Sequence, residues 1–254
     1  MNKNTKFNYA FVNGLKMYYE IHGEGFPLVI LHGQFTTIEM FNKILPVLAK
    51  IRKVIAVEQQ GHGHTADIDR PLSFEQMADD TAALLKQLEI EKTDVFGYST
   101  GGSVALQLVY RHPKLVRKLA LSSTVYNTDG YYPQIKEAIQ HPSPDAFPSE
   151  MREAYKKVAP NPKGWAALIE KGARQATEDK GLTPDEVHSI IVPSLVMVAD
   201  GDIILPEHAE KLAGLLNTNL ITLPNSDHAS YIAEHPKTLL SKLTTFLNAS
   251  VSGK

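Results

Sequence analysis

The 254-residue sequence contains no cysteine. Disulfide bonds, thiolate metal sites and a cysteine nucleophile are therefore excluded together. The chain also lacks a run of about 18 apolar residues, the length that a membrane-spanning helix requires. Residues 1–14 have no apolar stretch like that of a signal peptide. We therefore expect a cytoplasmic protein without membrane insertion.

Strong charge of either sign is missing as well. The 26 lysines and arginines nearly balance the 28 aspartates and glutamates, which leaves a formal net charge of −2 at pH 7. Because a nucleic acid favours a basic surface, we expect no nucleic-acid partner and instead a small neutral or weakly charged molecule. The phosphate-binding motifs G-x-x-x-x-G-K-S/T and strand-borne G-x-G-x-x-G are also absent, which argues against a nucleotide.

Short strand-like and helical segments alternate along most of the chain. The segments "FNYAFV" and "LKMYYEIH" are separated by Asn-Gly, the strongest short hairpin signal. Further strands are expected at "PLVILH", "KVIAVE", "TDVFG" and "VRKLALSS", with helices over residues 37–50 and 73–88. Such alternation predicts an α/β fold, a mostly parallel sheet of about eight strands with helices on both faces. The opening hairpin adds an antiparallel edge.

The alternation stops after Ser123 for roughly 70 residues, a stretch that holds eight of the fifteen prolines. Short helical pieces such as "SEMREAYKKV" persist there. We expect a core domain of residues 1–124 and 193–254, with residues 125–192 inserted as a helical cap, or lid. The pattern resumes at "PSLVMVADGD" and ends in a helix over residues 231–247.

The stretch "DVFGYSTGGS" places Ser99 among three glycines: Gly97, Gly101 and Gly102. A strand precedes it and a helical pattern follows it, so the serine lies on a strand-to-helix turn. In a G-x-S-x-G nucleophile elbow the turn is so tight that a Cβ two residues before or after the serine would clash. The alternative is an ordinary turn with a helix-capping serine.

A serine nucleophile needs a histidine base and a carboxylate that holds the base in the right tautomer. His228 follows a late strand on a loop, whereas His208 and His235 lie in or beside predicted helices. For the carboxylate, "VMVADGDIILP" offers Asp200 and Asp202. We favour Asp202, which lies further from the strand and can turn back toward a loop histidine; both could simply form the turn.

Acyl transfer also needs two backbone N–H groups that bind the tetrahedral oxyanion. One is expected from Thr100, which follows the nucleophile at the start of a helix. The other is expected from Gln34 in "VILHGQFTT", since Gly33 lets the backbone of that loop approach closely.

Over residues 7–247, the order Ser99, Asp202, His228 resembles that of the α/β-hydrolase family. The motifs "HGQF", "EQQGHGHT" and "GYSTGG" carry the resemblance, which is closest to small capped esterases, lactonases and perhydrolases. In that family the acid typically precedes a proline by four residues, as Asp202 precedes Pro206. The sequence departs from the family at Thr100, where many relatives have methionine, and at "SDH", where a glycine often precedes the histidine.

The resemblance implies a serine hydrolase that cleaves small carboxylic esters or lactones through an acyl-serine intermediate, without a cofactor, as a monomer or homodimer. Haloalkane dehalogenases and epoxide hydrolases carry aspartate at the position of Ser99 and are disfavoured. A C–C bond hydrolase or a cofactor-free perhydrolase on the same triad stays open, as does a slow-turnover receptor that binds a small signalling molecule. Slow turnover would identify the receptor.

Two further features have plain structural explanations. In "GHGH", His62 and His64 lack the additional ligands of a catalytic metal centre, so we expect no metal. Aromatic residues of the insertion could line a substrate pocket, although packing between the cap and the core accounts for most of them. These aromatics are Tyr131, Tyr132, Phe147, Tyr155 and Trp165.

Overall fold

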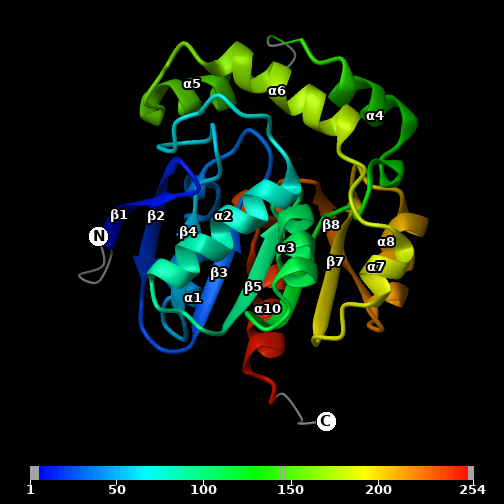
Figure 1. Ribbon diagram of the computed structural model, residues 1–254. Coiled ribbons are helices and arrows are strands. Elements are labelled where there is room, and N and C mark those ends of the chain that lie inside the picture. Colours follow the sequence, from blue (N-terminus) through cyan, green and yellow to red (C-terminus); the bar gives the residue numbers. More distant parts are fainter. Residues whose placement is uncertain (1–5, 144, 146, 251–254) are drawn as a thin grey trace.

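The computed structural model describes residues 6–143, 145 and 147–250 and contains an eight-stranded sheet (Figure 1). The order of the strands is β1-β2-β4-β3-β5-β6-β7-β8. Strands β1 and β2 form an antiparallel hairpin, β2 pairs antiparallel with β4, and the others pair in parallel. The predicted α/β fold is therefore confirmed. The bounds are β1 Lys6–Val12, β2 Leu15–His22, β3 Pro27–Leu31, β4 Lys53–Val57, β5 Thr93–Tyr98, β6 Val116–Ser122, β7 Ser194–Gly201 and β8 Leu220–Asp227.

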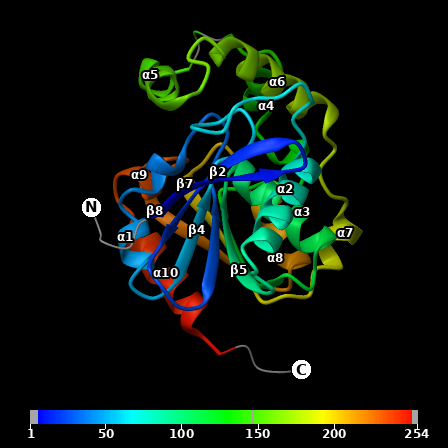
Figure 2. The ribbon, with the colours of Figure 1, turned by 60° about the vertical axis from the view of Figure 1, so that its left-hand side comes forward.

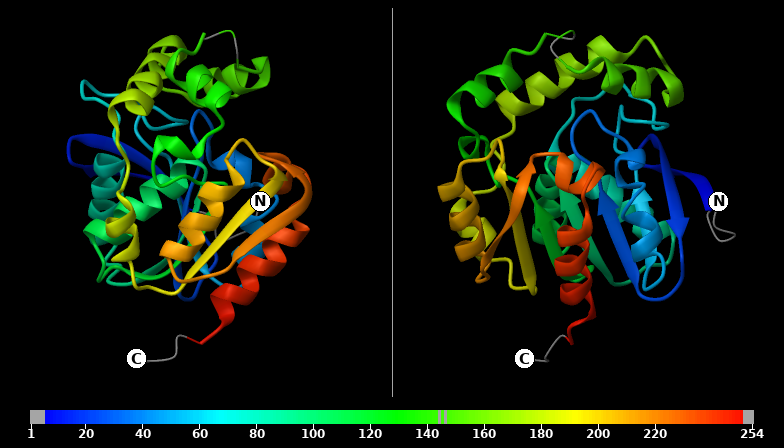
Figure 3. Two further views of the ribbon diagram at one scale, coloured as in Figure 1. Left: turned by 90° about the vertical axis from the view of Figure 1, so that its right-hand side faces the viewer. Right: turned by 180° about the vertical axis from the view of Figure 1, so that it is seen from behind.

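Helices cover both faces of this sheet, and alternate residues of each central strand point to opposite sides. On β3, Val29 and Leu31 face one apolar cluster, whereas Leu28 and Ile30 face the other. The first cluster includes α2 (Phe74–Gln87), α3 (Thr100–Arg111) and α8 (Pro206–Leu215). The second includes α1 (Leu45–Leu48) and α10 (Lys237–Asn248), which lies across the rear face in Figure 3.

Two of the predicted helices are interrupted. The segment expected as one helix over residues 37–50 forms a 3-10 helix, η1 (Ile38–Phe41), and the short α1, in which Pro46 occupies the first turn. The expected final helix is divided into α9 (Ser230–Ala233) and α10. Pro236 causes the second interruption, because proline cannot donate the backbone hydrogen bond that would continue the helix.

Residues 125–192 form α4 (Pro133–Gln140), α5 (Ser149–Val158), α6 (Trp165–Glu178) and α7 (Pro184–His188), after the 3-10 helix η2 (Thr128–Gly130). Helices α4 to α6 lie above the ends of the sheet strands in Figures 1 and 2, whereas α7 packs beside α8. Within the described residues, no helix combines the length and apolar character needed to cross a membrane.

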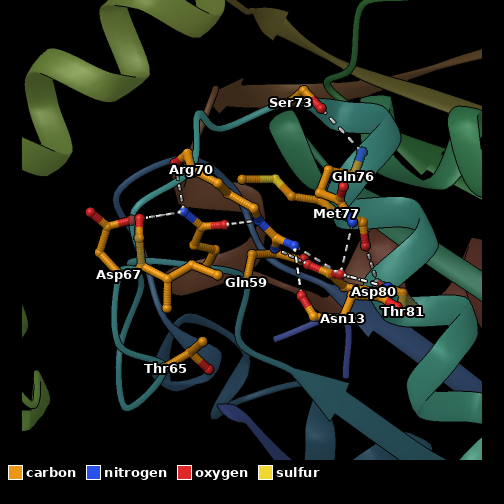
Figure 4. A network of polar contacts seen from close by, with 12 residues as sticks. Asn13, Gln59, Thr65, Asp67, Arg70, Ser73, Gln76, Met77, Asp80 and Thr81 are labelled. Atoms are coloured by element: carbon orange, nitrogen blue, oxygen red, sulfur yellow. Dashed lines mark hydrogen bonds and ion pairs between the residues drawn. The ribbon is translucent and has the colours of Figure 1, made fainter. Parts of the chain in front are cut away.

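The loop between β4 and α2 links the sheet to α6. On its inner side, Arg70 pairs with Asp80 of α2, a carboxylate with no exposed surface that also accepts hydrogen bonds from Asn13 and Gln76 (Figure 4). On its outer side, the Lys171 ammonium of α6 donates to the Asp67 carboxylate at 3.0 Å and to two carbonyl groups of the loop. The network holds the loop against α2 and gives α6 a fixed docking point.

Candidate active site

Ser99 lies at the turn between β5 and α3, with φ 52° and ψ −124°. A side chain rarely adopts this left-handed region, and here the surrounding glycines make room for it. A Cβ on Gly97 would lie 2.6 Å from the Cα of Gly102, and a Cβ on Gly101 would clash with the end of β3. The tight strand-to-helix turn expected from the sequence is therefore present, and it holds the Ser99 side chain at the carboxyl edge of the sheet.

The structure brings Ser99, His228 and Asp202 together from three separate loops. His228 follows β8, and its Nε2 lies 3.0 Å from Ser99 Oγ. Its Nδ1 lies 2.7 Å from Asp202 Oδ1, on the loop after β7. The remaining candidates lie elsewhere: His208 is buried on α8 against Tyr126, and His235 is exposed and pairs with its neighbour Glu234.

The side chain of Asp202 is only 1% exposed and accepts hydrogen bonds on both oxygens. Oδ1 accepts from His228 and from the Ile203 N–H, while Oδ2 accepts from Ser123 and from the Ala199 N–H. Burial alone would raise its pKa, but the hydrogen bonds from His228, Ser123 and Ala199 hold the pKa below the ordinary value. The carboxylate is therefore stabilised in its charged form.

Asp200 has a different environment, although it lies only two residues away. Its carboxylate is exposed and accepts the backbone N–H groups of Asn225 and Ser226, both within 2.9 Å. These hydrogen bonds lower its pKa. Asp200 thus holds the end of β8, which precedes His228, but does not contact the imidazole.

The Gln34 peptide is oriented by its neighbour. The Gly33 carbonyl accepts hydrogen bonds from the Thr36 hydroxyl and from His32 Nδ1, both at 2.8 Å, and from the Thr36 N–H. Because C=O and N–H point in opposite directions across a trans peptide, the Gln34 N–H points away from these donors. Within the described chain, neither this N–H nor that of Thr100 donates a hydrogen bond. Both are free for a ligand.

Close approach of this loop to Ser99 depends on Gly33. A Cβ there would lie 2.8 Å from the Tyr98 ring and 3.3 Å from the Ser99 Cβ. The neighbouring Phe35 has φ 60°, so the loop also contains a strained residue.

His32 stabilises the loop as a neutral imidazole. Its Nε2 accepts the Gln59 N–H at 3.1 Å, which leaves the proton on Nδ1 for the Gly33 carbonyl. Burial, with a smaller effect of His62, lowers the pKa of His32 to about 4. Sequence reasoning had assigned no function to this residue.

Sequence reasoning also missed the groups behind Asp202. Tyr231 accepts a hydrogen bond from Ser122 and donates to Ser123, which in turn donates to Asp202. In addition, Thr124 donates to the Ser99 carbonyl. The signal was the polar run "SST" at the end of β6, which lies between β5 and β7 and so reaches the same edge of the sheet.

A cavity of about 520 Å³ reaches Ser99 and His228 from beneath helices α4 to α6. Its lining is mostly apolar and, among the described residues, includes no lysine or arginine. A larger depression of about 1340 Å³ lies between α2 and the end of α3, and Ser99 is not part of it. The cavity that reaches Ser99 is therefore the candidate substrate site.

The aromatic residues of the insertion have more than one kind of environment. Tyr131 and Phe147 line the cavity, and Phe147 also packs edge-on against Trp165. Trp165 is buried at 4% exposure and packs against Phe35 and Tyr155, so it joins α6 to the loop of Gln34.

His62 and His64 do not share a site. The His62 ring is buried with its Nδ1 at 2.9 Å from the Gln60 carbonyl, whereas His64 stacks on Tyr18 and contacts Glu58. In the described part of the chain, no three side chains of the metal-binding types are grouped as ligands.

Comparison with known proteins gives a match to the sequence model described as "Alpha/beta hydrolase family" over residues 28–242. A 2-hydroxymuconate semialdehyde hydrolase from Pseudomonas sp. (strain CF600) is 39% identical over 103 residues, which are 39% of this chain and 36% of that protein. A soluble epoxide hydrolase from Corynebacterium sp. (strain C12) is 36% identical over 43% of this chain and 38% of its own length. The chain thus spans little more than a third of these two relatives. The AB hydrolase superfamily protein YisY from Bacillus subtilis is 26% identical over 92% of this chain and 96% of that protein.

Solved structures extend the likeness to the whole fold. The enol-lactonase from Burkholderia xenovorans LB400 has a TM-score of 0.79 at 22% identity and covers 95% of this chain and 100% of its own. A meta-cleavage product hydrolase from Pseudomonas fluorescens IP01 has a TM-score of 0.81 at 19% identity, covering 95% and 97%. At these identities the likeness concerns the fold alone.

Proposed function

Because the chain belongs to the alpha/beta-hydrolase family, we propose that it is a serine hydrolase that cleaves carboxylic esters or lactones of small molecules. The observation that carries the proposal is the contact of 3.0 Å between Ser99 Oγ and His228 Nε2, on a strained turn and beside a largely apolar cavity. A serine held in this way by a histidine and a carboxylate is the arrangement that acyl transfer requires.

In the proposed mechanism, His228 Nε2 removes the hydroxyl proton while Ser99 Oγ attacks the ester carbonyl carbon. The N–H groups of Gln34 and Thr100 stabilise the resulting oxyanion. Asp202 holds the Nδ1 proton of His228 and stabilises the imidazolium. The intermediate then collapses, the imidazolium gives its proton to the leaving alcohol, and an acyl-Ser99 ester remains.

In the second half of the reaction, water is the nucleophile and Ser99 Oγ is the leaving group. His228 takes a proton from the water molecule, hydroxide adds to the acyl carbon, and the two N–H groups stabilise the second oxyanion. Collapse of this intermediate returns the proton to Ser99 Oγ and releases the acid. The proposed sequence uses no metal or cofactor.

We further propose that residues 125–192 act as a cap on a core of residues 1–124 and 193–254. Helices α4 and α6 contribute Ile135, Ile139 and Gln175 to the cavity wall, so the cap encloses the substrate. The largely apolar wall favours acyl or alcohol groups of low polarity.

Hydrolysis of a C–C bond is the second candidate. It is favoured by the identity of 39% to a semialdehyde hydrolase, over a segment that contains less than half of the chain. The cavity, however, offers no cation among its described lining residues to an anionic substrate. Activity on a diketone that exceeds activity on every ester would favour this candidate.

The proposal is tested with purified protein, p-nitrophenyl esters of increasing chain length, lactones and a fluorophosphonate probe. We expect turnover of some ester and covalent labelling, and we expect Ser99→Ala to abolish both while the far-ultraviolet circular dichroism spectrum is retained. Labelling that persists in Ser99→Ala would assign the nucleophile to another residue.

A further inference from the structure

Two glutamines that line the cavity, one from the core and one from the cap, contact each other through their side chains. Gln34 Nε2 lies 3.4 Å from Gln175 Oε1, a long hydrogen bond between residues 141 positions apart. Gln175 is only 3% exposed. Each side chain also has a buried polar atom without a partner in the described part of the chain, namely Gln34 Oε1 and Gln175 Nε2. Buried amide groups are normally hydrogen-bonded, so these two atoms require an explanation.

The choice of amide orientation does not remove these unpaired groups. The oxygen and nitrogen of a glutamine amide can be exchanged by a rotation of the side-chain end. If both amides are turned, Gln175 donates to Gln34, and one carbonyl and one NH₂ group are again left unpaired. In either orientation the pair presents one hydrogen-bond acceptor and one donor.

Close packing places the pair beside the proposed oxyanion site. A Cβ on Gly172 would lie 2.8 Å from Gln34 Nε2 and 2.6 Å from the Phe35 ring, so glycine allows α6 to approach this loop. The backbone N–H of Gln34 is the group proposed above to bind the oxyanion. Gln34 and Gln175 line the cavity together with Ser99. A bound ester would therefore extend past both amides.

The charge of the surroundings limits what the two amides can bind. No lysine or arginine is among the described residues of the cavity wall. One turn beyond Gln175, the Asp179 carboxylate also lines the cavity and accepts the N–H groups of Phe74 and Gly181. A carboxylate on the substrate would meet no cation here and would approach Asp179, whereas an uncharged polar group would not be repelled.

We propose that Gln34 and Gln175 form a polar subsite that binds an uncharged donor–acceptor group, a hydroxyl or a carboxamide, carried by the ester or lactone substrate. The proposal rests on the function proposed above and narrows it. The preferred substrates are neutral, with an apolar chain and one internal or terminal polar group. The subsite also joins α6 to the loop that carries the Gln34 N–H.

Binding to the Ser99→Ala variant tests this subsite separately from catalysis. The ligands are methyl esters of increasing chain length that end in a methyl, hydroxyl, carboxamide or carboxylate group, with Kd measured by titration calorimetry. The quantity compared is the ratio of Kd for the polar ester to Kd for the methyl-ended ester of equal length. We expect Gln175→Met to shift this ratio by about tenfold against the hydroxyl or carboxamide ester, as loss of one buried hydrogen bond would do.

Thr177→Ala is the matched control, because this threonine is exposed on the same helix and is not part of the cavity wall. If Gln175→Met does not fold, Gln34→Met makes the same test from the other partner while retaining the backbone N–H. An unchanged ratio in the glutamine variants would overturn the subsite, and so would tightest binding of the carboxylate ester. The function proposed above fails by a different result, the absence of ester or lactone turnover by the unaltered protein.

Discussion

Replacement of Asp202 by asparagine tests the proposed acid, because an amide has one acceptor oxygen where the carboxylate has two. Asp202 accepts four donors, two on each oxygen, and each oxygen receives one backbone N–H, from Ile203 or Ala199. An asparagine amide must place its NH₂ group where one of these oxygens lies. In either orientation the asparagine NH₂ group therefore faces the backbone N–H of Ile203 or Ala199, and neither of these two donors can accept a hydrogen bond from the other.

The orientation decides what happens to the imidazole. With NH₂ on the Oδ1 side, the amide donates to His228 Nδ1 and forces the proton onto Nε2, so the ring cannot accept the Ser99 proton. With NH₂ on the Oδ2 side, the hydroxyl of Ser123 can rotate to accept, but the Ala199 N–H stays unpaired. We expect kcat to fall by about 10³- to 10⁴-fold through the wrong tautomer and the lost charge. The unpaired N–H should also lower the free energy of unfolding by about 1–3 kcal/mol.

Asp200→Asn is the matched control for this experiment. Its amide oxygen can still accept a backbone N–H from the end of β8, and the side chain does not contact His228. The assay is steady-state hydrolysis of the best p-nitrophenyl ester, with urea unfolding of each variant. We expect Asp200→Asn to retain kcat within about tenfold. A larger loss of kcat in Asp200→Asn than in Asp202→Asn would refute the assignment.

Two further predictions concern stability. Burial lowers the pKa of His32, His62 and His208 to about 4, so these side chains stay neutral when folded, whereas the unfolded chain protonates them below about pH 6.5. The free energy of unfolding should therefore be insensitive to these groups above pH 6.5 and fall between pH 6.5 and about 4, by about 2 kcal/mol for each histidine at pH 5. Urea unfolding at several pH values measures the free energy of unfolding, and a value that does not fall between pH 6.5 and about 4 would contradict this prediction. Lys118 donates to three carbonyl groups at the end of α10, so Lys118→Met should lower the free energy of unfolding by about 1–3 kcal/mol. Lys114 is exposed, and Lys114→Met should change the free energy of unfolding little. Equal effects of the two substitutions would contradict the capping role of Lys118.

The sheet could be predicted from the sequence because its signals are local. Apolar strand residues, the Asn-Gly turn and the regular helices between strands each act over a few neighbours in the chain. The division of the expected final helix also has a local cause and could have been predicted, because Pro236 cannot donate the backbone hydrogen bond that would continue α9 into α10.

For the candidate site, the edge of the sheet supplied the long-range information. Parallel strands that end at one edge bring their following loops together, so Ser99, Asp202 and His228 could be grouped before any distance was known. The same argument applied to β6 would have reached Ser123, but serines are common after strands and nothing local distinguishes this one. Its hydrogen bond to Asp202 depends on the left-handed φ of 48° that Ser123 adopts.

No comparable rule predicts from the sequence which residues of the proposed cap contact the core. Gln175 is an example. Its contact with Gln34 joins residues 141 positions apart, and it forms only because α6 approaches the loop at Gly172. A glutamine on an amphipathic helix ordinarily marks the solvent-facing side, so its burial contradicts the local pattern. Such a contradiction is expected where a side chain serves a ligand, because a polar group held in an apolar wall is costly until something binds it. The proposed chemistry at Ser99 is thus predictable from strand ends, whereas the proposed polar subsite depends on contacts between α6 and the loop of Gln34 that only the folded chain creates.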